Sequence, residues 1–209
     1  MIETVGSKLM ALAQPRSLIL ALALLVLASC LPPFEGVPAD ETRVGISLTE
    51  AQSLVPFTIC LPEYLPDTVG KDAQITYHAD FGDPMESDIQ LRYYRRGTTE
   101  VVVEIVENHW PRASVQYEIT DVSKESSLRD LLAWIVGWEK WEEAMAQAQA
   151  TFSVGQDDQQ WSLVEITDPP ALRANLIEWA EDPVFYRLYT RLPAQDALQI
   201  AVSTTDCLE

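Results

Sequence analysis

Alternating apolar and polar positions recur along much of the chain and predict a series of short β-strands. The clearest is 100–107 (EVVVEIVE), in which Val101, Val103 and Ile105 point to one side. The other predicted strands are 73–78, 89–94, 115–119, 161–166, 174–179 and 184–189, with a shorter alternation at 57–61. Because these segments are short, sequential and separated by turn residues, they favour an antiparallel sheet.

Helical spacing of apolar residues marks two further segments. Ser47 followed by Glu50 fits a capping box and predicts a helix over 48–54, which Pro56 ends. Residues 127–150 carry apolar side chains at helical spacing and predict one long helix, with Trp134, Trp138 and Trp141 on one side.

The three tryptophans allow three interpretations. They cover the sheet as part of the core, or they form a ligand gate or a partner-binding face. A helix lying on the membrane surface is the third, but such a helix normally carries lysine and arginine on its polar face, where this one carries glutamate.

The first 30 residues resemble a bacterial export signal. Lys8 and Arg16 precede an uncharged run, 17–27, that is shorter than the roughly 20 residues of a membrane-spanning helix. Leu27-Ala28-Ser29-Cys30 resembles a lipobox, which implies cleavage between Ser29 and Cys30 and a diacylglycerol on Cys30. The alternative is a plain secretory signal, or an N-terminal anchor that contains a cysteine. The expected organisation is a signal peptide at 1–29, a lipidated flexible tether at 30–46 and one extracytoplasmic domain at 47–209.

Two motifs resemble an uncharacterised bacterial family, the domain of unknown function 4367. One is E-A-Q-x-x-V-P-F-x-I-x-x-P-x-Y-L-P at 50–66, and the other is the tryptophan-tyrosine hairpin at 177–188, followed by LPAQDALQIAVS at 192–203. The resemblance covers 47–106 and 176–203, and 127–150 departs from it as a helical insertion. It implies a closing helix at 192–203 and an extracytoplasmic location in lipoproteins or regulator-like proteins. It implies no catalytic residues, since none is assigned in that family.

Together these patterns predict an α+β fold. We expect a curved antiparallel β-sheet, with one long tryptophan-rich helix and a short C-terminal helix packed on it.

The net charge bears on possible partners, and the cysteines bear on a disulfide bond. The 209 residues include 32 Asp and Glu against 14 Lys and Arg, a net charge of -18 that argues against nucleic-acid binding. Outside the cytoplasm, Cys60 and Cys207 are expected to form a disulfide. The alternative is two unpaired thiols.

No motif points to catalysis. His78 and His109 lack the spacing of a metal site, and the sequence has neither a glycine-rich phosphate loop nor a G-x-S-x-G nucleophile turn. We therefore expect a non-enzymatic protein without metal or cofactor.

The expected role is an interaction or sensory module of the cell envelope, held at a bacterial membrane by the lipid on Cys30. A carrier of an apolar ligand or lipid, enclosed between the sheet and the tryptophan-rich helix, is the alternative. A hydrolase ranks third, since it would need His78 or His109 beside a nucleophile and a carboxylate.

Overall fold

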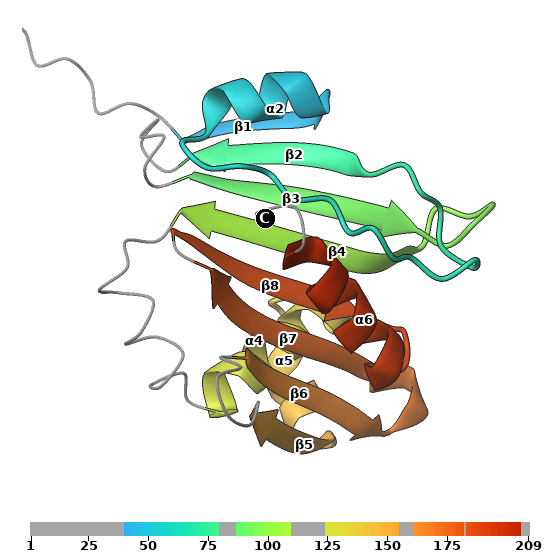
Figure 1. Cartoon of the computed structure of the whole chain (residues 1–209). Coiled ribbons are helices and arrows are strands. Elements are labelled where there is room, and N and C mark those ends of the chain that lie inside the picture. The colour runs from blue at the N-terminus through green and yellow to red at the C-terminus, as the bar shows by residue number, and fades with distance from the viewer. Residues whose placement is uncertain (1–39, 80–86, 110–123, 155–160, 182, 206–209) are drawn as a thin grey trace, which may run out of the picture. The chain divides into compact units, whose positions relative to one another are not determined.

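Antiparallel strands form one open sheet, in the order β1-β2-β3-β4-β8-β7-β6-β5 (Figure 1). The computed structural model describes residues 40–79, 87–109, 124–154, 161–181 and 183–205, all within the unit Ala39–Glu209. The strands are β1 (Glu41–Ile46), β2 (Gln74–Ala79), β3 (Ser87–Tyr94), β4 (Val101–His109), β5 (Gln149–Val154), β6 (Trp161–Asp168), β7 (Ala174–Glu181) and β8 (Val184–Thr190). The expected antiparallel sheet is confirmed.

The sheet consists of two four-stranded meanders joined at their edges. Strands β1 to β4 follow one another in the first meander, and β5 to β8 in the second. The join is the pairing of β4 with β8, which runs from Val103 opposite Thr190 to His109 opposite Val184. Residues far apart in the sequence therefore meet at the middle of the sheet.

Helices cover both faces of this sheet. They are α2 (Leu48–Leu54), α4 (Lys124–Val136), α5 (Trp141–Met145) and α6 (Ala194–Thr205). Figure 1 shows α6 in front of the sheet and α4 and α5 behind it. The adjacent residues Leu176 and Ile177 of β7 point to opposite faces, so Leu176 packs in the core under α4 while Ile177 packs in the core under α6. Within the described residues, no helix combines the length and apolar character needed to cross a membrane.

The predicted capping box is confirmed. The Ser47 hydroxyl accepts a hydrogen bond from the Glu50 N–H at 3.2 Å, and α2 spans Leu48–Leu54. Residues 57–61, however, form no strand. The Gln52 side chain donates to the Phe57 carbonyl at 2.6 Å and accepts from the Ile59 N–H at 3.0 Å, so a helix side chain satisfies the backbone that a neighbouring strand would otherwise bind.

The prediction of one helix over 127–150 is wrong. Helix α4 ends at Val136 because Gly137 has a left-handed φ of 86°. A turn then leads to the short α5, and residues 149–150, assigned to the helix from sequence, begin β5. Helical spacing of apolar residues continues through the break, which is why the pattern alone did not reveal it.

One further boundary differs from the prediction, and one predicted strand is not tested. Residues 41–46, expected to belong to a flexible tether, form β1 and pair with β2. This strand is mostly exposed, so its sequence lacks the apolar alternation that identified the inner strands. The strand predicted at 115–119 lies outside the described residues.

We predict that Gly137→Ala lowers the free energy of unfolding by about 1–2 kcal/mol, the cost of a left-handed alanine. A Cβ at this position would meet no atom within 4 Å, so the effect arises from the backbone alone. In a continuous helix the same substitution would instead stabilise by roughly 1 kcal/mol. Urea denaturation distinguishes the two results, and a gain in stability would contradict the break at Gly137.

Candidate functional site

Three of the described glutamates are buried, and the two most deeply buried lie on opposite faces of the sheet; the third, Glu104 on β4, is 8% exposed and binds Arg92 at 2.6 Å. Glu107 on β4 is 0% exposed and Glu178 on β7 is 2% exposed. A buried carboxylate is costly unless hydrogen bonds or a counter-charge compensate it. The surroundings of these two residues are therefore the first places in the sheet to look for a functional site.

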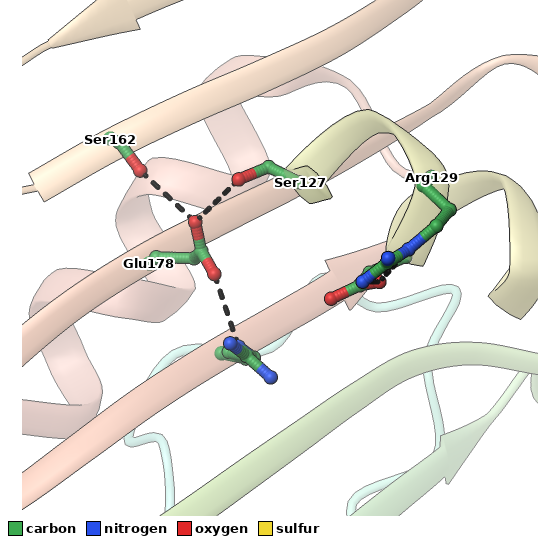
Figure 2. Close-up of polar contacts among 6 residues, drawn as sticks. Ser127, Arg129, Ser162 and Glu178 are labelled. Carbon is green, nitrogen blue, oxygen red and sulfur yellow. Dashed lines mark hydrogen bonds and ion pairs between the residues drawn. The ribbon is translucent and has the colours of Figure 1, made fainter. Parts of the chain in front are cut away.

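Glu178 is the centre of a polar cluster beneath α4, shown in Figure 2. Ser162, Glu178 and Arg187 are direct cross-strand neighbours on β6, β7 and β8. One Glu178 oxygen accepts from Arg187 Nε at 3.0 Å. The other accepts from the Ser127 hydroxyl of α4 at 3.0 Å and from the Ser162 hydroxyl at 3.4 Å. Both oxygens of the buried carboxylate are thus satisfied.

This cluster fixes the start of α4 on the sheet. Burial acts to lower the pKa of Arg187, but Tyr189, Glu178 and Asp130 outweigh it, so the pKa is raised and the guanidinium stays charged. Ser127 is buried and donates its hydroxyl proton to Glu178. A closed ion pair of this kind fits anchoring of the helix rather than nucleophilic attack, which needs an accessible hydroxyl and a base.

Glu107 lies on the other face, beneath the segment that follows α2. Both of its oxygens are 3.2 Å from the backbone nitrogen of Cys60, which donates to them. Its cross-strand neighbour Tyr186 stacks on Trp179 with ring centroids 4.9 Å apart. Burial raises the pKa of Glu107 to about 8, despite the opposing effect of the Cys60 N–H. The carboxyl is therefore largely neutral at pH 7.

The environment of Cys60 favours the predicted disulfide. Cys60 is fully buried, and the Tyr186 hydroxyl lies 3.7 Å from its sulfur. Near the end of α6, the Ser203 carbonyl and hydroxyl accept from the N–H groups of Glu63 (3.5 Å) and Tyr64 (3.1 Å). This brings the chain shortly before Cys207 beside the chain shortly after Cys60. Cys207 itself lies outside the described residues, and the bridge remains a prediction.

The three tryptophans do not share one environment. Trp134 is half-buried and stacks on Tyr189 with ring centroids 5.8 Å apart. Trp141 is also half-buried and packs against the core under α4. Trp138, in the turn after Gly137, is 65% exposed, and the Arg129 guanidinium lies 5.8 Å from its ring centroid. Two of the three therefore cover the sheet and one faces solvent.

The histidines lie at separate places. His78 Nδ1 is 3.6 Å from Asp88 Oδ2, its cross-strand partner on β3. The ring of His109 stacks on Phe57 with centroids 6.5 Å apart. In the part of the chain that the structure describes, no group of three or more His, Cys, Asp or Glu residues is placed to hold a metal ion.

The predicted lipidation and cleavage residues, Cys30 and Ser29, lie outside the described residues. No known protein-family model matches the chain, and no curated protein or solved structure is significantly similar to it. The resemblance drawn from the opening and closing motifs thus remains a prediction.

Sequence reasoning did not identify Glu107 or Glu178. A signal was present, because each is a charged residue at an inward position of an otherwise apolar strand, EVVVEIVE or ANLIEWAE. The partners could not be inferred, since Cys60 and Ser127 are 47 and 51 residues away along the chain.

We predict that Glu107 makes the protein less stable as pH rises. The folded state holds this proton up to a pKa of about 8, while the unfolded carboxyl loses it near 4.5. The contribution of Glu107 to stability is therefore fully present below pH 4.5. It is lost progressively as pH rises from 4.5 through 8, and the loss levels off at higher pH. Urea denaturation should show a loss on the order of 4 kcal/mol between pH 5 and pH 9 that Glu107→Gln removes.

The contributions of all other titrating groups to the pH dependence cancel when the free energies of unfolding of the two proteins are compared at each pH. An identical pH dependence in the wild type and Glu107→Gln would show that Glu107 titrates normally.

Proposed function

We propose that the chain is a lipid-anchored, extracytoplasmic interaction module of the cell envelope, and that it is not an enzyme. The observation that carries this proposal is Trp138. Its indole is 65% exposed on a short turn held between α4 and α5. Exposed tryptophans on ordered segments are typical anchor residues of protein–protein interfaces.

The surroundings of Trp138 suit such a role. The Lys140 N–H donates to the Gly137 carbonyl at 3.1 Å, which closes the turn. Arg129 binds Asp130 at 2.9 Å while its guanidinium lies near the indole. The side chain is thus supported before a partner arrives, which limits the entropy lost on binding.

The buried polar residues support a non-enzymatic role. Glu178 and Ser127 join α4 to the sheet, and Glu107 joins the sheet to the Cys60 segment. Each of these side chains is buried and already joins two parts of the fold. The geometry thus favours a binding surface over a reaction site.

We favour this role over the apolar carrier because α4 packs tightly on the sheet. Leu131 and Leu132 are fully buried, and Trp134 rests on Tyr189. A helix bound through these contacts and through Ser127 covers a core, whereas a lid over a ligand has to separate from the sheet.

The proposed anchor places this module near a bilayer. If Cys30 carries lipid, only about ten residues separate it from the start of β1 at Glu41. A fully extended chain of that length spans at most about 35 Å. A partner within the membrane or at its surface is therefore within reach.

The partner surface can be tested by site-specific photo-crosslinking in the native membrane. A photoreactive residue replacing Glu139, exposed beside Trp138, should give one discrete adduct, which excess purified protein competes away and which excess Trp138→Ala protein does not. Val44 and Val202, exposed 62% each, are matched control positions and should give no such adduct. The same adduct at all three probe positions, or none at Glu139, would contradict the proposal.

We predict that Cys30→Ala moves the protein from the membrane fraction to the soluble fraction, because covalent acyl chains are expected to provide the anchor. Fractionation with incorporation of an alkyne fatty acid measures both effects. A Cys30→Ala protein that still sediments with membranes would refute the lipid anchor and leave the Trp138 surface as a separate question.

A further inference from the structure

A pocket of about 440 Å³ lies where strand ends of the second meander meet. It is lined by residues 165–167 of β6, by the start of β7 and by the residues that follow β8. Arg173 and Arg191 both line it, and we call it the Arg173–Arg191 pocket. Its volume is within the range of small-molecule sites.

Arg173, Arg191 and Arg96 are the described arginines without a carboxylate partner, and the first two share this pocket. Arg43, Arg92, Arg95, Arg129 and Arg187 each bind a carboxylate. Arg173 and Arg191 contact backbone carbonyls instead, at Thr167 (3.0 Å) and Ala171 (3.4 Å). Among the described residues neither has a carboxylate within ion-pair distance, although Arg191, after Arg95, helps to lower the pKa of Glu100 from farther away. In a protein of net charge -18, two such guanidinium groups at one pocket indicate an anionic ligand group.

Asn175 adds a second, independent feature to the same pocket. It is 4% exposed, and its Nδ2 donates to the Leu192 carbonyl at 2.7 Å, which fixes the orientation of the amide. Its Oδ1 is buried and has no hydrogen-bond partner among the described residues. Glu165, directly opposite Asn175 on β6, also lines the pocket. Both side chains accept hydrogen bonds, so they suit a ligand that carries a donor.

We propose that the Arg173–Arg191 pocket binds a small carboxylate with an adjacent N–H or O–H donor, that is, an α-amino or α-hydroxy acid. The ligand carboxylate binds the two guanidinium groups. Its ammonium or hydroxyl donates to Glu165, and to Asn175 Oδ1 after a small side-chain shift that opens this buried oxygen to the pocket. A bare anion would leave Asn175 unsatisfied, and a bare cation would be repelled by the arginines. The site is independent of the proposed Trp138 surface.

Calorimetric titration of the full-length protein tests this proposal. The probes are the twenty L-amino acids, lactate and malate, with sulfate as an anion that lacks a donor and putrescine as a cation that lacks a carboxylate. We expect saturable one-to-one binding of at least one amino or hydroxy acid, and at least tenfold weaker binding of sulfate and putrescine.

Substitution of each pocket arginine tests whether the ligand binds in the Arg173–Arg191 pocket. Arg173→Gln and Arg191→Gln should each weaken that binding about tenfold, the effect of losing one charge-assisted hydrogen bond. Arg96→Gln is the matched control, because Arg96 is an exposed arginine outside the pocket that also has no carboxylate partner among the described residues. Its affinity should change less than twofold. Circular dichroism confirms that each variant is folded.

Three results would overturn the proposal. They are no binding of any amino or hydroxy acid at millimolar concentration by the folded protein, sulfate binding as tightly as the best of them, and equal affinity in the wild type and both pocket variants.

Discussion

The pairing of β4 with β8 is the contact on which the rest of the structure depends. Each four-stranded meander is a local structure, built from neighbours in the sequence. The pairing from Val103–Thr190 to His109–Val184 unites them into one sheet, and the Thr190 hydroxyl and the Arg191 N–H extend it by donating to the Val102 carbonyl. An isolated small meander has little apolar surface to bury, whereas the united sheet supports a core on each face. Glu107 and Tyr186 become neighbours through this pairing, so the buried carboxyl and its aromatic surroundings exist only once the meanders have joined.

Glu178 and Glu107 each connect the sheet to a different covering element. Glu178 connects α4 on one face, and Glu107 connects the Cys60 segment on the other. The two differ in electrostatics, because Arg187 compensates Glu178, while Glu107 has no counter-charge among the residues that the structure describes and its pKa is raised by burial. The first contact is thus an ion pair, and the second is a neutral hydrogen bond near pH 7. Stability of the two faces should therefore respond differently to pH.

The functional surfaces proposed here lie at the margins of this framework. Trp138 occupies the turn where α4 is interrupted, and the Arg173–Arg191 pocket occupies the ends of strands. Both lie where regular secondary structure ends, which is where binding residues are often found. The sheet holds both in fixed positions, and its residues Glu165 and Asn175 line the pocket.

Local patterns in the sequence determined the inner strands, the antiparallel class and the capped helix at 48–54, because period-2 alternation and a capping box depend on neighbouring residues only. The sequence pattern does not reveal the edge strand β1, because an exposed strand lacks that alternation. It does not reveal the break at Gly137 either, because helical spacing of apolar residues continues across it. Tertiary structure alone decided that Trp138 is exposed while Trp134 is covered, and that Ser127 meets Glu178. It also decided that Arg173, Asn175 and Arg191 line one pocket. These contacts join residues many positions apart, and the physical reason is that strand pairing, not spacing along the chain, brings them together.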